Sequence, residues 1–268
     1  MSLIHWWPLT GHAQDMVGNK HGELVGSPSL TETGKIGYCY STNTTNTYKS
    51  GQGVNVPNCN LINELGSEYS FACWFKVHGT HPDYNGTIMS SGNWNTQCWA
   101  VGISKDNTQI DVFCDHYNQW LPIGYTLSNN VWYHLVSAQK NGVNYVYLNG
   151  ELLGTRNSTA LYRTDYSNLC IGRETYAGGY FGFNGDINDI RVYNHCLSPR
   201  EVKLLAQGLI AHYKMSGIHM DNLIPGGGFA GTNSWTGGKI DWSVSAAGDV
   251  ASLKLDKGTN VASTPIAV

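Results

Sequence analysis

The sequence predicts an all-β fold in which two antiparallel sheets form a sandwich, with one short helix near its end. Its 268 residues include 32 glycines, 9 tryptophans and 16 tyrosines but only 13% charged residues, a composition typical of a β protein with many turns. Strand-like segments recur about every ten residues, as in a sandwich. Residues 132–154, WYHLVSAQKNGVNYVYLNGELLG, hold two Asn-Gly pairs between alternating segments and predict a three-stranded meander, which needs a second sheet to pack against.

The chain before this meander contains one strong strand pattern and several shorter ones. In residues 68–77 (EYSFACWFKV), Phe71, Cys73 and Phe75 alternate with Trp74 and Lys76, which predicts a central strand. Further strands are expected at residues 3–9, 22–25, 36–40, 53–56, 87–91, 98–103, 109–114 and 120–125. The polar stretch between 36–40 and 53–56 predicts that these two strands form a hairpin with a long loop.

The chain after the meander predicts two strands and a helix. The strands are expected at residues 168–172 and 183–193. Residues 198–208 (SPREVKLLAQG) have a complete helix signature, because Ser198 can cap the start, Pro199 suits the first helical position and Glu201 closes a capping box. Gly208 can end this helix in the left-handed conformation.

A second module is expected after the helix. Residues 209–217 resemble residues 3–11, and Asp221 then falls on Asp15. We therefore expect one domain over residues 1–207 and the start of a small or truncated second β module over 208–268. Chance similarity over so short a segment is the alternative explanation.

Charge and cysteine usage exclude several classes of protein. The net charge is −3 and the basic residues are scattered, so nucleic-acid binding is not expected. No apolar run approaches the roughly 20 residues that span a bilayer, so membrane insertion is not expected, and the start MSLIHWWPL has no visible export signal. The 7 cysteines form no CxxC pair, which favours buried free thiols over disulfides and fits synthesis in a reducing cytoplasm.

Several segments together resemble a known family. They are WWPLTG, DMVGNKHG, FACWFKV, the 132–154 meander and FNGDINDIRVYNHCLSPREV. In this order they resemble a laminin-G-like or pentraxin-like domain of the concanavalin A-like superfamily, over about residues 1–207. The resemblance implies a jelly-roll sandwich that binds glycans or proteins, often with a structural calcium ion. It also implies tandem modules of the kind found in phage virion and bacterial surface proteins.

Catalytic motifs are missing from the sequence. Laminarinase-type relatives carry E-x-D-x-x-E on one strand, and no such run is present. Asp186 and Asp189 have an odd spacing that directs them to opposite faces of a regular strand, unless a bulge intervenes, and Asp189 near Arg191 suggests a structural ion pair. No GxSxG, HExxH or Walker motif occurs, and the histidines show no metal-ligand spacing. We therefore expect a module that is not an enzyme.

A calcium site is expected where oxygen ligands converge. Asp15 and Asn19 lie in a glycine-containing loop, and the resemblance implies that this loop meets the last strand, which adds Asp186 or Asp189. Alternatively, Asp15 anchors a turn and Asn19 adopts a left-handed conformation.

Sugar binding is expected at three loops that combine aromatic rings with polar groups. The candidate residues are Trp94, Asn95, Asp115, Tyr117, Trp120, Tyr176 and Tyr180. Alternatively, Trp94 and Trp120 cover the core. Trp7, Trp74 and Trp132 lie in strand patterns and are expected in the core, with His134 as a hydrogen-bonded core histidine.

These observations predict a carbohydrate-binding adhesion module of a phage virion, in a tail or fibre, that recognises host surface glycans. Its partners are then surface glycans or other virion or surface proteins, and it forms a homo-oligomer within a larger assembly. The alternative function is a structural or protein-interaction module of the tail or capsid without a sugar ligand, and a glycoside hydrolase ranks below both. The expected location is the virion, reached from the host cytoplasm, with a bacterial cell-surface or secreted protein as the alternative.

Overall fold

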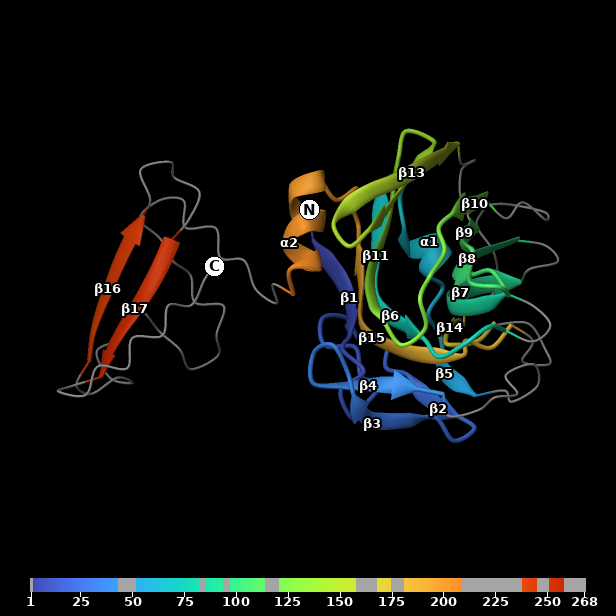
Figure 1. Cartoon of the computed structure of the whole chain (residues 1–268), viewed down its shortest axis with the longest axis horizontal. Helices are drawn as coiled ribbons and strands as arrows, with labels where there is room; N and C mark the ends of the chain where they lie inside the picture. Colours follow the sequence, from blue (N-terminus) through green and yellow to red (C-terminus); the bar gives the residue numbers. More distant parts are fainter. Residues whose placement is uncertain are drawn as a thin grey trace. The chain divides into compact units, whose positions relative to one another are not determined.

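The computed structural model describes residues 2–42, 52–81, 85–93, 97–113, 121–157, 168–174, 181–208, 238–244 and 251–257. The chain divides into two compact units, residues 1–208 and 209–268. In the first unit two antiparallel sheets pack as a sandwich with helix α2 (Pro199–Ala206) on its outside, as in a concanavalin A-like jelly roll (Figure 1). The predicted fold class is therefore confirmed.

The eight-stranded sheet contains the predicted central strand and the meander. Its order is β13 (Glu151–Asn157), β12 (Val143–Leu148), β11 (Trp132–Lys140), β6 (Tyr69–Val77), β15 (Gly185–Tyr193), β4 (Tyr38–Ser41) and β3 (Ser29–Thr33), and β1 (Leu3–Trp7) also pairs with β15. Both Asn-Gly turns have two positive φ angles, 51° and 72° at Asn141 and Gly142 and 52° and 89° at Asn149 and Gly150. The hairpin-turn prediction is confirmed.

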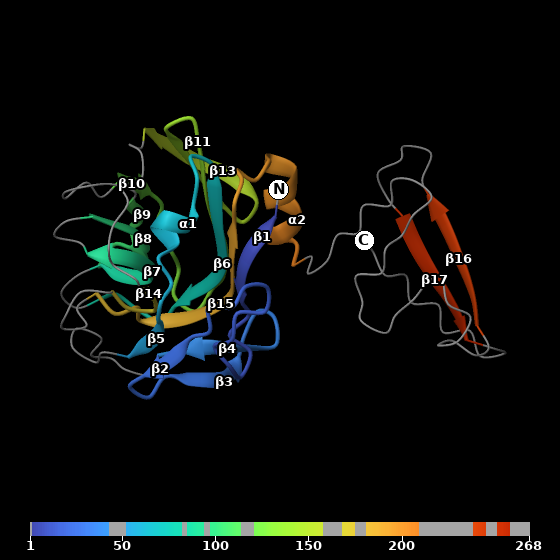
Figure 2. The same ribbon diagram turned by 180° about the vertical axis from the view of Figure 1, so that it is seen from behind.

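The seven-stranded sheet forms the other layer (Figure 2). Its order is β10 (Leu121–Gly124), β9 (Gln109–Phe113), β8 (Gln97–Ile103), β7 (Gly86–Asn93), β14 (Leu169–Ile171), β5 (Gly53–Val56) and β2 (Glu23–Val25). Because β4 belongs to the eight-stranded sheet and β5 to this one, the hairpin predicted from the polar stretch between them is wrong.

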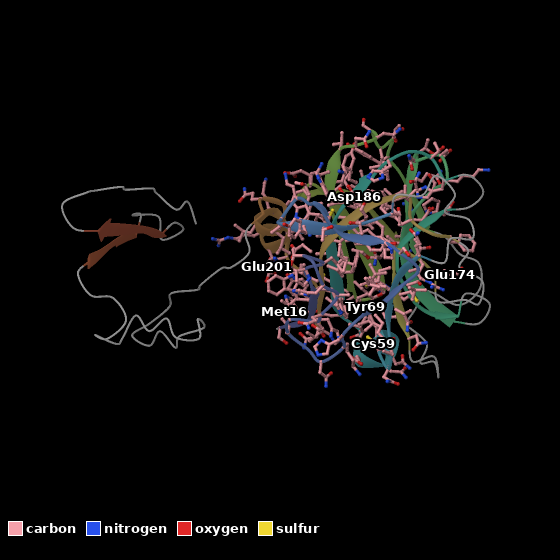
Figure 3. All side chains as sticks on the ribbon, turned by 90° about the horizontal axis from the view of Figure 1, so that it is seen from below. Met16, Cys59, Tyr69, Glu174, Asp186 and Glu201 are labelled. Carbon is pink, nitrogen blue, oxygen red and sulfur yellow. The ribbon has the colours of Figure 1, made fainter. Side chains whose placement is uncertain are left out.

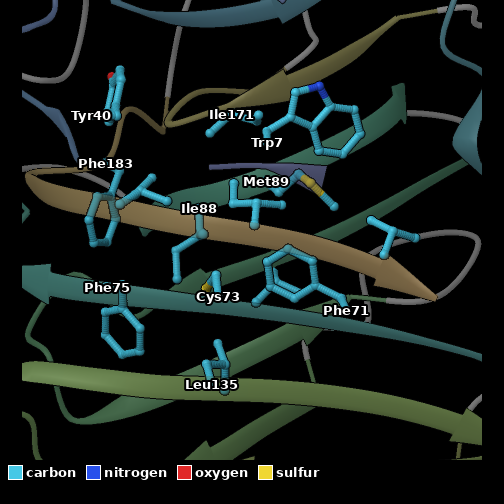
Figure 4. Packing of buried hydrophobic residues seen from close by; sticks show 14 of the residues in the cluster. Trp7, Tyr40, Phe71, Cys73, Phe75, Ile88, Met89, Leu135, Ile171 and Phe183 are labelled. Carbon is cyan, nitrogen blue, oxygen red and sulfur yellow. The ribbon is translucent and has the colours of Figure 1, made fainter. Parts of the chain in front are cut away.

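The core lies between the two sheets (Figure 4). Phe71, Cys73 and Phe75 of β6 point into it, as the alternating pattern predicted, and Ile88 and Met89 of β7 meet them from the other sheet. Each fully buried side chain of this size contributes about 1.5–3 kcal/mol to folding. The alternate residues of β6 therefore lie on an outer face of the sandwich.

Helix α2 covers one end of the outer face of the eight-stranded sheet (Figure 1). Its capping box forms as predicted, because the Ser198 side chain accepts from the Glu201 backbone N–H while the Glu201 carboxylate accepts from the Ser198 N–H. Gly208, with φ of 79°, follows the helix. Val202 packs with Ala72 of β6 and Val136 of β11.

Two short elements were not predicted, the edge strand β3 and the single-turn helix α1 (Leu61–Glu64), which Asn60 caps. The second unit contains an antiparallel pair, β16 (Gly238–Val244) and β17 (Ala251–Lys257). The repeat at 209–217 and Asp221 lie outside the described residues. Neither described helix has the length and apolar character needed to cross a bilayer.

Candidate functional site

The two outer faces of the sandwich differ in their side chains. On the eight-stranded sheet, the residues that alternate with the core of β6 and β11 include Trp74, Lys76 and Trp132. Three tryptophan rings here each carry a cation, at the following distances to the ring centroid: Lys35 Nζ over Trp74 at 4.8 Å, Lys76 Nζ over Trp132 at 5.0 Å, and Arg191 Cζ over Trp6 at 5.3 Å. We call this surface the tryptophan face.

The predicted ligands Asp186 and Asp189 lie on the tryptophan face in two ion pairs. A bulge between Asn188 and Arg191, with φ of 56° at Asp189, interrupts the regular alternation of β15. Asp189 Oδ1 accepts from Arg191 Nε at 3.0 Å, which confirms the predicted ion pair, and from the Trp6 indole at 2.7 Å. Asp186 pairs with Lys76 at 2.6 Å and His78 at 3.0 Å.

Asp15 is buried and organises the loop after β1. Its Oδ1 accepts backbone N–H groups of Trp6, Val17 and Gly18 at 3.0–3.1 Å, and its Oδ2 lies 2.7 Å from His5 Nδ1. Burial would raise the pKa of this carboxyl, but these hydrogen bonds outweigh it and lower the pKa. Asp15 therefore anchors a turn, one of the two alternatives considered for it.

The four candidate calcium ligands do not form one set of converging oxygens. Asn19 is exposed and is not among the residues with a positive φ, so the left-handed conformation considered for it is wrong. Asp15, Asp186 and Asp189 each accept hydrogen bonds from their own N–H donors. Among the described residues, the only group of three or more His, Cys, Asp and Glu side chains close enough to share an ion is a different one, His5, Cys59 and Glu64.

The outer face of the seven-stranded sheet carries small side chains instead. Neighbouring strands place one row of them in register: Asn55 beside Cys170, Cys170 beside Ser90, and Ser90 beside Ala100. A second row aligns Thr87, Gly102 and Asp111. We call this surface the small-residue face.

Two acidic side chains are buried at the small-residue face. The chain turns at Gly172, with φ of 73°, and the Arg173 carbonyl accepts from Ser90 Oγ at 3.2 Å, which brings Glu174 onto this face. Glu174 is 6% exposed, its Oε2 has no hydrogen-bond partner in the part of the chain that the structure describes, and burial raises its pKa to about 7. Burial, together with the negative charge of Asp106, raises the pKa of Asp111 to about 6, although Asn85 Nδ2 donates to it at 2.7 Å.

All seven candidate sugar-binding residues lie outside the described residues: Trp94, Asn95, Asp115, Tyr117, Trp120, Tyr176 and Tyr180. The described strands nevertheless show where their segments begin and end. The segment 94–96 connects β7 to β8, and 114–120 connects β9 to β10 at the same end of the seven-stranded sheet. The segment 175–180 follows Glu174 and precedes Phe181, whose carbonyl accepts from the Thr87 N–H at 2.9 Å.

The strand tryptophans divide between core and surface. Trp7 is in the core, as predicted, whereas Trp74 and Trp132 lie on the tryptophan face and only Trp74 is buried. Their placement in the core was wrong because alternation identifies a face of a strand without showing which face is inside. His134 is buried on the same face beside Trp74, with 5.0 Å between the ring centroids, and its Nδ1 has no hydrogen-bond partner among the described residues.

Asp111 and Glu174 were not among the residues predicted from the sequence. Asp111 takes the outward position between the core residues Ile110 and Val112, and Glu174 follows Arg173 between a buried strand and an aromatic, glycine-rich segment. Both signals are visible but weak. Five of the seven cysteines have described side chains. Cys39, Cys59, Cys73 and Cys170 are buried free thiols, as predicted, and Cys196 is a half-buried free thiol.

Several solved structures share this fold at low sequence identity. Domain 4 of AbnA, an extracellular GH43 arabinanase from Geobacillus stearothermophilus solved with arabinotriose, has a TM-score of 0.58 and 19% identity, covering 77% of this chain and 98% of that domain. Trypanosoma rangeli sialidase, solved with the inhibitor DANA, has a TM-score of 0.57 and 14% identity, covering 78% of this chain and 34% of the sialidase chain. A structure of botulinum neurotoxin type C, a toxin whose cell entry depends on interaction with two ganglioside molecules, has a TM-score of 0.56 and 15% identity. The match covers 78% of this chain and 52% of that chain.

This chain therefore spans about a third of the sialidase and half of the toxin chain. No curated protein sequence matches it significantly. A sequence family does match, however, over residues 48–203, which include strands of both sheets and most of helix α2. The chain belongs to that family, a laminin-G-like family of the concanavalin A-like lectin/glucanases superfamily.

Proposed function

We propose that this protein binds glycans, without altering them chemically, at the small-residue face of the seven-stranded sheet. One observation carries the proposal. Two of the three aromatic and amide-rich segments selected from the sequence, 94–96 and 114–120, join strands of this sheet at the same end. The third, 175–180, lies between Glu174 and Phe181, and the Phe181 carbonyl accepts from the Thr87 N–H near the other end of strand β7. Small side chains fill less space above a sheet than large ones do. The described members of this face are themselves buried, at 1–6% exposure: Thr87, Ser90, Ala100, Asp111 and Cys170.

The chemistry of the two faces supports this choice. Pyranose rings pack on the free faces of aromatic side chains, while neighbouring polar groups hydrogen-bond to the hydroxyls. On the tryptophan face a cation already lies over each of the three rings. At the small-residue face, Glu174 and Asp111 supply buried carboxyl groups that can exchange hydrogen bonds with sugar hydroxyls. Solved structures of similar fold that hold arabinotriose or depend on gangliosides add support.

A glycan array probed with the full-length protein tests the proposal, followed by calorimetry on each glycan that binds. Trp120→Ala and Tyr117→Ala should weaken binding at least tenfold, about 1.4 kcal/mol, because each removes an aromatic platform. Trp132→Ala is the matched control on the tryptophan face and should leave affinity unchanged. Equal losses in all three variants, or no glycan bound at all, would contradict the proposed site.

Glycoside hydrolysis is the second candidate function, because a carboxyl group with a pKa near 7 suits a general acid. Glu174 has that property and Asp111 shares its face. Hydrolysis also requires a second carboxylate that stays ionised or activates water, and Asp111, with a pKa of about 6, is largely ionised at neutral pH. Incubation of each bound glycan with protein and with Glu174→Gln, followed by product analysis, separates the two functions, since binding alone releases no product.

The biological setting we propose is a phage virion, where the module recognises host surface glycans from a tail or fibre as part of a homo-oligomeric assembly. Five free thiols fit synthesis in a reducing cytoplasm before release. A bacterial surface protein, or a structural module that binds other virion proteins, is the alternative. Mass spectrometry of purified virions tests the setting, and finding the protein in the secreted fraction of uninfected cells would contradict it.

A further inference from the structure

A second polar cluster lies away from both outer faces, where β1 meets helix α1. It contains His5, Cys59 and Glu64, and the ligand-capable nitrogen, sulfur and oxygen atoms of these three residues lie within 4.8 Å of one another. His5 is 4% exposed and Cys59 is fully buried, whereas the Glu64 side chain reaches solvent. Figure 3 shows Cys59 beside the short helix, well separated from Glu174.

Asp15 orients the histidine of this cluster. Its Oδ2 lies 2.7 Å from His5 Nδ1, and its two oxygens accept four backbone N–H groups that hold the carboxylate in place. A carboxylate that accepts the Nδ1 proton leaves Nε2 as the nitrogen that can donate a lone pair. Nε2 lies 2.9 Å from Glu64 Oε2, a hydrogen bond with a proton between the two atoms, and a metal ion bound by both side chains would take the place of that proton. The stacked ring of Trp7, 5.2 Å away, restrains the imidazole further.

We infer that His5, Cys59 and Glu64 bind a transition-metal ion, of which Zn²⁺ fits best. Thiolate and imidazole ligands select zinc over calcium or magnesium, and a His–Cys–Glu set with a carboxylate behind the histidine is a normal zinc environment. Zinc lies about 2.0–2.3 Å from such ligands, so atoms now within 4.8 Å need to move by roughly 1 Å to share it. Because Glu64 reaches solvent, water can take the fourth position.

Lys20 competes with a metal ion for the Glu64 carboxylate. Lys20 Nζ lies 3.5 Å from Glu64 Oε1 and donates to the Asn58 carbonyl at 2.6 Å. Its charge repels a metal ion bound at Oε2, so removing that charge should strengthen metal binding. The bound ion would connect strand β1 to the segment between β5 and α1, which are far apart in sequence.

Cobalt(II) titration of the reduced full-length protein tests the inference, because tetrahedral cobalt with a thiolate ligand shows a charge-transfer band that histidine-only sites lack. We expect one equivalent of cobalt, with this band, displaced by one equivalent of zinc. Cys59→Ser should lose the band, Glu64→Gln should bind at least tenfold more weakly, and Lys20→Met should bind more tightly. Cys196→Ser, which removes a free thiol outside the cluster, should behave as wild type.

Far-UV circular dichroism of each variant separates loss of the site from loss of the fold. Glu64→Gln is the decisive variant if Cys59→Ser does not fold, because its side chain is partly exposed and keeps its shape. Cobalt binding without the thiolate band, or an unchanged affinity in folded Glu64→Gln, would overturn the inference. Neither result bears on glycan binding, which is assigned to other residues.

Discussion

The two outer faces of the sandwich are built from the same strand geometry but have opposite chemistry. On the eight-stranded sheet, large aromatic rings are covered by cations, Asp186 and Asp189 are in ion pairs, and helix α2 seals one end. On the seven-stranded sheet, side chains are small and Glu174 has a carboxylate oxygen with no partner among the described residues. The eight-stranded sheet has buried atoms without such a partner too, among them the ring nitrogens Trp74 Nε1 and His134 Nδ1. Figure 3 places Glu174 and Glu201 of helix α2 on opposite sides of the sandwich.

This difference indicates that the tryptophan face contributes mainly to stability and the small-residue face mainly to ligand binding. A face whose charges are paired and whose rings are covered has little left to offer a ligand, and its residues contribute to the folded state. A buried group without a partner lowers stability and is retained more readily when a ligand supplies that partner. The tryptophan face should therefore respond to substitution through folding, and the small-residue face through binding and pH.

The largest effect is expected under helix α2. Val202→Asp places a charge in the fully buried cluster that includes Ala72 and Val136, and should lower the free energy of unfolding by more than about 3 kcal/mol. Urea denaturation measures it. The matched control is Lys203→Gln, which removes an exposed pair with Glu151 and should change stability by less than about 0.5 kcal/mol. Similar values for the two variants would show that the helix does not seal this face.

A smaller loss is expected from Lys76→Met, which leaves the buried Asp186 without its ammonium partner. Stability at pH 7 should fall by about 2 kcal/mol, while Lys140→Met, at an exposed pair with Glu68, should change it little. Burial would raise the pKa of Asp186, but hydrogen bonds from His78, Lys76 and Ser41 lower it. Its stabilising effect is therefore present above about pH 4 and lost as pH falls. The difference between wild type and Lys76→Met should shrink on acidification, and a constant difference would contradict the pairing.

Glu174 on the small-residue face should change stability with pH in the opposite direction to Asp186, and Glu174→Gln tests this. Because burial raises the pKa of Glu174 to about 7, the folded protein holds this proton while the unfolded chain has lost it, so stability falls as pH rises from about 4.5 to 7. Glutamine removes that dependence. The variant should be about 1–3 kcal/mol more stable than wild type at pH 8 and equal to it below pH 4, measured by denaturation at both.

The exposed Glu23→Gln serves as the control and should show no such difference between the two pH values. A destabilised Glu174→Gln at pH 8 would mean that the carboxylate is needed in its charged form, and the comparison between the faces would then fail at its most informative residue.

Local signals in the sequence were enough to predict much of this fold. Alternation in β6, the turns at Asn141-Gly142 and Asn149-Gly150, and the capping box at Ser198 depend on neighbours a few residues away. The choice of sheet for β4 and β5 depends on pairing with strands far along the chain, so the predicted hairpin between them was wrong. Which face of β6 and β11 is inside depends in the same way on the opposite sheet.

The sites were harder to predict for the same physical reason. The bulge at Asp189 moves a carboxylate without leaving a mark in the sequence. His5, Asp15, Cys59 and Glu64 converge only after β1 and α1 are placed, so no local spacing identifies them. The seven sugar-binding candidates, by contrast, were selected by composition alone and remain a prediction.

The smallest effect on stability is expected from Lys35→Met, and this variant also tests which of the two sheets binds the glycan. Lys35 is exposed and its ammonium lies 4.8 Å from the centre of the Trp74 ring, so Lys35→Met should lower stability by only about 0.5–1 kcal/mol. The same change frees that ring face of its cation. If the tryptophan face were the glycan platform, Lys35→Met would alter glycan affinity, because a newly accessible ring can stack on a sugar. Since we assign binding to the other sheet, calorimetry should give the wild-type affinity, and a change of threefold or more in either direction would move the binding site to the eight-stranded sheet.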